Sequence, residues 1–440
     1  MVPEKFSGMS REGMFTDMES ICPEKLYVEL TTRCNLHCPM CVKQAAGSNI
    51  AEGDLPLETF KKLSPSLGNI RSLILNGIGE PLLHPDLEEM VRLARSRMPG
   101  DGTIGFQSNG FLLDRQRAVK LMQAGIDTIC LSLDSLEDVR SGGHAPAAVT
   151  RAVEALIQAR SEAGRPFRIG IEMVLGQESI GGLPDLVMWA AGREVDYLIA
   201  THLFLYDKAA EKDSLFNPNP ADAVDIFLKY NKMAADAGHS LGGYLATYLK
   251  FNKTAADRQL LEIVERMQKE AREKDIHLHL PSLIKHNPVK QGVVEKAFKQ
   301  AGAIARQLDI DLFLPPLQAP ATHSCPFMTE KATFIGINGD VMPCHFLWHS
   351  YFCRVLGEDV RVGKRVFGNI NQRLLEEIWW SEDYRQFRLQ AARYDYASCW
   401  SCSLGPCATL VNDNLYANDC YGSAVPCGHC QWSLGGIRCL

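Results

Sequence analysis

From about residue 25, short apolar runs alternate along the chain with amphipathic stretches whose apolar residues recur every three or four positions. The apolar runs have the length of buried strands, and the amphipathic stretches have the period of helices that cover a sheet. The predicted strands are Leu26–Thr31, Ser72–Asn76, Thr103–Gln107, Thr128–Leu133, Arg168–Leu175 and Tyr197–Leu205. The predicted helices include Asp86–Arg97, Asp114–Ala124, Ala147–Ala163 and Leu183–Gly192.

This alternation predicts an α/β fold. Asp86 and Asp114 precede two of the helices as N-caps, and Gly125 and Gly164 stand where two helices should end. Six strand–helix units in this order favour a parallel sheet, either open or closed into a barrel. Binding residues are then expected at the carboxyl ends of the strands.

Residues 207–320 follow a different pattern and are expected to form a mostly helical insertion or cap. Two similar segments, Ala271–Pro281 and Ala305–Pro315, start 34 residues apart and predict two helix-then-strand units. The run Pro315–Pro320 can continue neither a helix nor a central strand, so it predicts a linker. The expected division is a tail (1–20), a barrel (21–206), this insertion (207–320) and a cysteine-rich domain (321–440).

Composition narrows the function classes. The 440 residues carry a formal net charge of −6, which argues against a nucleic-acid partner because phosphate binding needs a basic face. Residues 1–20 mix charged with single apolar residues and lack the apolar stretch of a secretory signal. Apolar runs such as Leu198–Tyr206 are much shorter than the roughly 20 residues of a membrane-spanning helix. We therefore expect a cytoplasmic protein with no membrane partner.

The fifteen cysteines are unevenly distributed, with three at Cys34, Cys38 and Cys41 and ten between Cys325 and Cys439. In a reducing cytosol such groups favour metal binding or catalysis over structural disulfides. The other two, Cys22 and Cys130, are expected to be small buried hydrophobic residues.

The first cysteine group directly follows the first predicted strand and has the spacing CxxxCxxC. Three thiolates can hold three corners of a [4Fe–4S] cluster and leave one iron open for another ligand. A structural zinc site, by contrast, is closed by four ligands. His37 lies between the cysteines and is either that fourth ligand or a surface histidine.

With this loop in this place, the chain resembles the radical SAM superfamily, which implies a partial (β/α)6 barrel. The resemblance implies that S-adenosylmethionine (SAM) binds the open iron of the cluster. One electron from the reduced cluster would then cleave the sulfonium C–S bond. The products would be methionine and a 5′-deoxyadenosyl radical that abstracts hydrogen from a substrate.

Three further segments match positions where this superfamily binds its cofactor. The sequence NGIGEP at 76–81 follows the second strand and resembles the GGEP motif, and polar residues end the third and fourth strands. The resemblance implies cofactor contacts from Gly77, Gly79, Glu80, Ser108, Asn109, Ser132 and Asp134. Turns and caps are the structural alternative, since Gly, Ser, Asn and Asp are common in both. The fifth strand departs from the superfamily's adenine-contacting pattern.

The late cysteines begin with Cys325, thirteen residues, Gly339, four residues and Cys344. Between them, Phe334–Val341 predicts a β-hairpin with an Asn-Gly turn. The other candidate ligands are Cys399, Cys402, Cys407, Cys420, Cys427, Cys430 and Cys439. Zinc is the alternative metal for the CxxC pairs. Cys353 lies outside every such spacing and is expected to be spare.

The opening spacing resembles the CX(9–15)GX4C of the SPASM extension, which implies one or two auxiliary [4Fe–4S] clusters. Compared with the usual SPASM spacing, the later cysteines have one shorter gap and three additional cysteines in the tail, Cys427, Cys430 and Cys439. Which cysteines bind the same cluster therefore stays open. The tail from Cys427 resembles that of SPASM proteins thought to mature metalloenzymes, including tungsten-dependent aldehyde oxidoreductases.

These features together predict a radical SAM enzyme that modifies a peptide, a protein or a metallocofactor precursor. Its electrons are expected from a donor such as ferredoxin or flavodoxin. One alternative is a peptide cyclase that forms thioether or C–C crosslinks. Another is a non-catalytic iron–sulfur carrier or scaffold, which has no use for an open iron.

Overall fold

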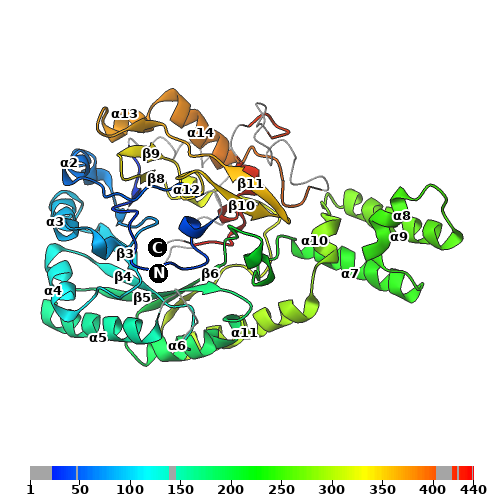
Figure 1. Ribbon diagram of the computed structural model, residues 1–440, viewed down its shortest axis with the longest axis horizontal. Coiled ribbons are helices and arrows are strands. Elements are labelled where there is room, and N and C mark those ends of the chain that lie inside the picture. Colours follow the sequence, from blue (N-terminus) through cyan, green and yellow to red (C-terminus); the bar gives the residue numbers. More distant parts are fainter. Residues whose placement is uncertain (1–21, 46–47, 138–144, 403–418, 424–425, 439) are drawn as a thin grey trace.

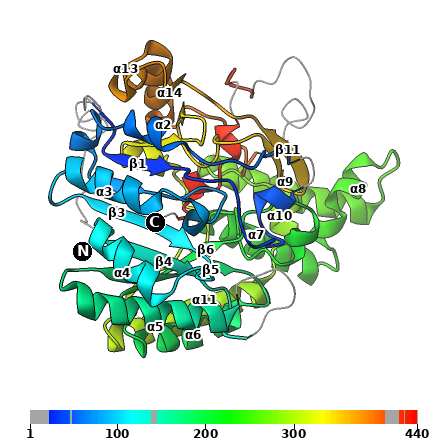
Figure 2. The same cartoon turned by 60° about the vertical axis from the view of Figure 1, so that its left-hand side comes forward.

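The computed structural model describes residues 22–45, 48–137, 145–402, 419–423, 426–438 and 440. Within these residues a curved sheet carries helices on its outer face, and a group of helices projects to one side (Figures 1 and 2). No helix in the described part of the chain is both long and apolar enough to cross a bilayer.

The main sheet has ten strands, of which the first seven in sequence run parallel to their neighbours. Its strands are β1 (Lys25–Val28), β2 (Ser72–Ile74), β3 (Thr103–Ser108), β4 (Thr128–Ser132), β5 (Arg168–Leu175), β6 (Tyr197–His202), β7 (Asp311–Phe313), β8 (Ala332–Ile335), β9 (Asp340–Met342) and β12 (Gly368–Asn369). Their order is β12-β9-β8-β1-β2-β3-β4-β5-β6-β7. Strands β10 (Tyr351–Val355) and β11 (Glu358–Val362) form a separate antiparallel hairpin.

All six predicted barrel strands are present, and the expected partial (β/α)6 barrel is confirmed. Four strands end earlier than predicted: β2 at Ile74 and β4 at Ser132 by one or two residues, and β1 and β6 by three. β1 ends at Val28, and Thr31 beyond it makes an isolated antiparallel bridge with Asp54. β6 ends at His202, whose main-chain N–H donates to the carbonyl of Gly436 at 2.9 Å. The C-terminal segment therefore lies beside the carboxyl end of β6.

The helices are α2 (Leu57–Lys61), α3 (Leu87–Arg97), α4 (Arg115–Ala124), α5 (Pro146–Ala163), α6 (Leu183–Ala191), α7 (Ala221–Asp236), α8 (Tyr244–Leu249), α9 (Ala255–Glu273), α10 (Leu280–Ile284), α11 (Pro288–Gln307), α12 (Pro326–Thr329), α13 (Leu375–Trp379) and α14 (Glu382–Arg393). Helices α4, α5, α6 and α11 lie outside the barrel sheet (Figure 1).

The predicted helix ends follow local chemistry. Asp114 caps α4 by accepting a hydrogen bond from the N–H of Arg117 at 2.7 Å. Gly125 and Gly164 follow α4 and α5 in the left-handed region, with φ of 110° and 59°. Asp86 stands at the N-cap position of α3 but makes no side-chain cap hydrogen bond.

Helices α7 to α10 form a lobe that projects from the barrel (Figure 1) and has a core of its own. The predicted strand at the end of Ala271–Pro281 is wrong, because α10 begins at Leu280 and His279 caps it by accepting from the N–H of Ser282. The second repeat does give a strand, β7. It lies beside β6, whose edge offers the hydrogen bonds that a strand needs.

The sheet crosses both expected domain boundaries. β7 comes from the expected insertion, whereas β8, β9 and β12 come from the cysteine-rich domain. β8 pairs in parallel with β1, with Tyr27 opposite Phe334. The predicted hairpin is confirmed as β8–β9, with Gly339 at φ 82° in its turn. A single apolar core therefore joins the barrel to the cysteine-rich domain.

Candidate functional site

The CxxxCxxC loop leaves the carboxyl end of β1 and is anchored by polar contacts. Arg33 donates to both oxygens of the Asp54 carboxylate, with Nε–Oδ1 at 2.9 Å and an Nη–Oδ2 distance of 2.6 Å. Lys43 donates from Nζ to the carbonyl of Thr32 at 2.7 Å. A bidentate arginine–carboxylate pair fixes orientation as well as charge, so the loop is held at the barrel mouth.

The NGIGEP segment packs tightly against this loop. A Cβ on Gly77 would collide with the Glu29 side chain, and a Cβ on Gly79 would collide with the carbonyl of Thr31. Glu29 is fully buried, and its Oε1 accepts from the N–H of Ile78 at 3.1 Å. The glycines are therefore required by close packing, whichever ligand they meet.

Glu80 is almost fully buried and links the ends of β2 and β3. Its Oε1 accepts from Ser108 Oγ at 2.8 Å, and its Oε2 accepts from the N–H of Asn109 at 2.8 Å. It also caps a short turn by accepting from the N–H of Leu82. Asn109 in turn donates from Nδ2 to Asn35 Oδ1 at 2.8 Å, inside the cysteine loop. The strand ends and the loop thus form one hydrogen-bonded unit.

A cavity of about 220 Å³ lies where these segments meet. The lining residues that sequence analysis selected are Cys34, Cys38, Cys41, Gly77, Gly79, Glu80, Ser108, Asn109 and Ser132. Burial raises the pKa of the Cys34 and Cys41 thiols, so a bound cation is needed to hold them as thiolates near neutral pH. Three sulfur donors beside a polar, glycine-lined wall fit a cluster with one open iron and a polar ligand on it.

Asp134 and His37 lie outside the lining of this cavity. Asp134 Oδ1 accepts from the N–H of Val174 at 2.8 Å and so orients β5.

Sequence analysis missed three polar residues that line the cavity from inside the barrel. Asn76 donates to Gln107 at 2.5 Å, and Gln107 donates to the carboxylate of Glu172. Asn76 lies just beyond the end of β2, Gln107 is the next-to-last residue of β3, and Glu172 lies in the middle of the mostly apolar β5. A polar side chain in or beside a mostly apolar strand was the available sign, because a buried polar group needs a partner or a ligand.

A second cavity holds four thiols from distant parts of the chain. Cys325, Cys344, Cys427 and Cys430 line it together with aromatic side chains that include Tyr394 and Trp432. Burial raises the pKa of all four thiols, to about 11 for Cys325, and for Cys344, Cys427 and Cys430 neighbouring thiols raise it further. Four buried thiols are a donor set for an iron–sulfur cluster.

The other cysteines lie elsewhere. Cys353 is buried in β10, facing Val360 of β11, and is not among the residues that line the four-thiol cavity. Cys399 is buried with its Sγ near Gly428, while Cys402 is half-buried and Cys420 is exposed. Cys407 and Cys439 fall outside the described residues. Among the described residues, no three His, Cys, Asp or Glu side chains stand close enough to hold a single metal ion.

Comparison with protein families agrees with this arrangement. Residues 28–187 match the radical SAM superfamily, and residues 325–403 match SPASM, an iron–sulfur cluster-binding domain. These matches identify a radical SAM domain followed by a SPASM domain, and they indicate that the protein is an enzyme. The barrel binds a [4Fe–4S] cluster and SAM, and the C-terminal domain binds iron–sulfur clusters.

The curated relatives are similar to very different shares of this chain. The chain is 27% identical over 423 residues to the tungsten-containing aldehyde ferredoxin oxidoreductase cofactor-modifying protein of Pyrococcus furiosus, covering 94% of this chain and 96% of that protein. It is 37% identical to a GTP 3′,8-cyclase of Chlorobaculum tepidum, over 29% of this chain and 39% of that enzyme.

Two solved structures align at lower identity. The enzyme anSMEcpe with bound AdoMet is 15% identical, with coverage of 87% and 85% and a TM-score of 0.47. SuiB of Streptococcus suis bound to S-adenosylmethionine is 14% identical, with coverage of 83% and 68% and a TM-score of 0.44.

Proposed function

We propose that this enzyme cleaves SAM reductively to a 5′-deoxyadenosyl radical and uses it to modify a peptide, a protein or a metallocofactor precursor. The observation that carries the proposal is the barrel-mouth cavity, where three thiols meet the wall formed by Gly77, Gly79 and Glu80. When bound, the cluster supplies the electron that breaks the sulfonium C–S bond of SAM.

The chain's own residues supply the setting for that chemistry. Cys34, Cys38 and Cys41 hold the cluster and leave one iron free. The Glu80 carboxylate keeps the ends of β2 and β3 together through Ser108 and Asn109, which fixes the wall against which SAM lies. Gln107 of β3 and Glu172 of β5 supply further polar atoms to the lining of the same cavity.

We assign the four-thiol cavity to an auxiliary [4Fe–4S] cluster ligated by Cys325, Cys344, Cys427 and Cys430. Their convergence supports this set over one drawn from the run Cys399, Cys402 and Cys407. A four-thiol set leaves no iron of that cluster open, so electron relay suits it better than substrate ligation.

For the substrate, we propose a metallocofactor precursor or the metalloenzyme that carries it, with ferredoxin or flavodoxin as electron donor. Support comes from the relative named as modifying the cofactor of a tungsten-containing oxidoreductase, because its similarity extends over 94% of this chain and includes the cysteine-rich domain.

The test uses anaerobically reconstituted full-length protein with SAM and dithionite. We expect 5′-deoxyadenosine and methionine in equal amounts, detected by liquid chromatography and mass spectrometry. Protein that is fully loaded with iron and sulfide but forms neither product would contradict the proposal and favour an iron–sulfur carrier. A crosslinked peptide product from an added substrate peptide would instead favour the cyclase.

A further inference from the structure

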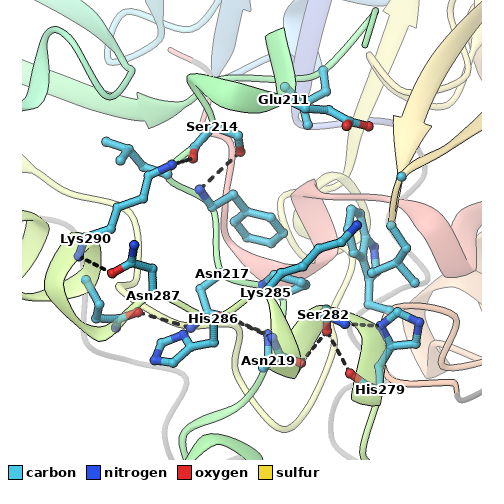
Figure 3. A pocket seen from close by; sticks show the side chains of 18 of the residues that line it. Glu211, Ser214, Asn217, Asn219, His279, Ser282, Lys285, His286, Asn287 and Lys290 are labelled. Carbon is cyan, nitrogen blue, oxygen red and sulfur yellow. Dashed lines mark hydrogen bonds between the residues drawn. The ribbon is translucent and has the colours of Figure 1, made fainter. Parts of the chain in front are cut away.

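A further cavity of about 290 Å³ (Figure 3) shares no lining residue with either cysteine cavity. It lies between the segment that follows β6, helices α10 and α11, the β10–β11 hairpin and the cysteine-rich domain. Its volume is at the lower end of the range for small-molecule sites. The cavity thus has the size of a small organic ligand and not of a folded partner.

The charge of its lining is positive. Lys285, Lys290 and Arg354 line it, together with His279 and His286, whereas Glu211 is its only carboxylate among the lining residues. That carboxylate is already paired, because Arg354 Nε donates to Glu211 Oε1 at 2.8 Å. The described residues include no ion-pair partner for Lys285. An anion is therefore the complementary ligand.

Part of the polar lining is occupied by bonds within the protein. Ser282 Oγ donates to Asn219 Oδ1 at 2.7 Å, and Asn219 Nδ2 donates to Asn217 Oδ1 at 3.1 Å (Figure 3). Lys290 donates from Nζ to the carbonyl of Ser214 at 2.7 Å. These internal hydrogen bonds hold the side chains of Ser282, Asn219 and Lys290 in place at the cavity.

Two buried donors of lining residues have no hydrogen-bond partner among the described residues. They are the indole Nε1 of Trp400, 6% exposed, and the amide Nε2 of Gln431, 4% exposed. Both residues line the cavity. A buried N–H without an acceptor is costly, so these two groups indicate an acceptor that a ligand supplies.

The remainder of the wall is apolar. Leu215, Val294 and Leu317 line it, and the Phe216 ring meets the Trp400 ring edge-on at 5.5 Å between centroids. Such a surface accepts a flat or aliphatic ligand body beside the anionic group.

We propose that this cavity binds a small organic anion, whose phosphate or carboxylate group faces Lys285 and whose acceptor atoms meet Trp400 Nε1 and Gln431 Nε2. The ligand lies beside the four-thiol site, since Gln431 directly follows Cys430. The proposed binding of this anion does not depend on the radical chemistry. Only the use of this ligand as the substrate rests on the proposed function.

The experiment measures binding to cluster-loaded full-length protein by anaerobic calorimetry, without SAM or reductant. The probes are phenyl phosphate and benzoate, which separate a phosphate from a carboxylate site, and neutral benzyl alcohol. We expect one saturable site for one of the two anions and weaker binding of the alcohol. Because SAM is absent, failure of the proposed cleavage would leave this result untouched.

The variant Lys285→Met keeps the length of the side chain and removes its charge. It should weaken anion binding roughly ten- to a hundredfold, as expected for loss of a charge-assisted hydrogen bond. Trp400→Phe keeps a ring but removes the N–H, and should weaken binding about fivefold. Lys299→Met is the matched control, since Lys299 is exposed on α11 and is not among the residues that line the cavity.

The proposal is overturned if neither anion binds saturably up to about 10 mM, which corresponds to an affinity too weak for a site. It is also overturned if Lys299→Met weakens binding as much as Lys285→Met, because that would indicate general surface charge. Melting temperatures of the variants show whether each is folded before binding is compared.

Discussion

The Glu80 carboxylate accepts a hydrogen bond from the Ser108 hydroxyl at 2.8 Å, across the gap between the ends of two parallel strands. This hydrogen bond connects the ends of β2 and β3, so Glu80 has a structural role in addition to any contact with the cofactor. The same carboxylate also accepts from the main-chain N–H groups of Asn109 and Leu82. The Glu80 carboxylate therefore both lines the cavity and connects the segments that form its wall.

Glu80→Gln should weaken SAM binding roughly ten- to a hundredfold and lower the free energy of unfolding by about 1–3 kcal/mol, without changing the iron content. A glutamine amide offers one acceptor oxygen, so one main-chain N–H would face an NH2 group. Equilibrium dialysis with SAM and melting curves measure the two effects. Glu58→Gln, at an exposed surface ion pair, is the control. Reduced stability with unchanged SAM binding would mean that Glu80 only holds the turn.

Replacing Cys34, Cys38 and Cys41 together with Ala should abolish formation of 5′-deoxyadenosine and remove about four irons per chain. The C-terminal iron should remain, because the four-thiol cavity draws all its cysteines from residues 325–430. Iron and sulfide analysis with a SAM cleavage assay measures both effects. Cys130→Ala, buried in β4, serves as control. Cleavage retained by the triple variant would remove the basis of the proposed function.

Cys427→Ser combined with Cys430→Ser should remove about four irons and lower the melting temperature, while SAM still binds at the barrel mouth. Metal binding and folding are coupled when a cluster joins distant segments, here the segments that flank the β8–β9 hairpin and the tail. Cys353→Ala should keep the full iron content, since Cys353 does not line that cavity. An unchanged iron count and melting temperature in the double variant would disprove the assigned ligand set.

The stability of the protein should fall as the pH drops from about 6.5 toward 4, in part because of His202. Burial lowers the pKa of His202 to about 4, against a small opposing effect of its bond to the carbonyl of Pro316. The unfolded histidine, with a pKa near 6.5, therefore binds a proton first as the pH falls, and this favours unfolding.

His202→Asn should reduce this pH dependence by up to about 1.4 kcal/mol per pH unit. The measurement is the difference in melting temperature between pH 7 and pH 5 for the two proteins. His277→Asn, at an exposed position in the lobe, should retain the full difference. An equal loss of stability in all three proteins would show that His202 does not contribute.

The order of residues that are close together in the sequence was enough to predict much of the fold and one of the two cysteine sites. The six barrel strands, most helix ends, the β8–β9 hairpin and the three-cysteine loop depend on residues within one element or one turn. Their physical causes are local. The spacing of apolar residues determines the strands and helices, and the left-handed conformation of Gly125, Gly164 and Gly339 determines the helix ends and the hairpin turn. Cys34, Cys38 and Cys41 are close together because few residues separate them in the chain.

Packing between distant segments settled the rest. Cys325 and Cys344 meet Cys427 and Cys430 because the tail folds back onto the segments that flank the β8–β9 hairpin, and no spacing along the chain encodes that contact. The helix-then-strand pattern was the same in both repeats, yet only β7 formed, since only it reached the free edge of β6. Gln107 and Glu172 became part of the site in the same way, because the sheet places β3 and β5 on either side of β4 and so brings together two side chains that are 65 residues apart.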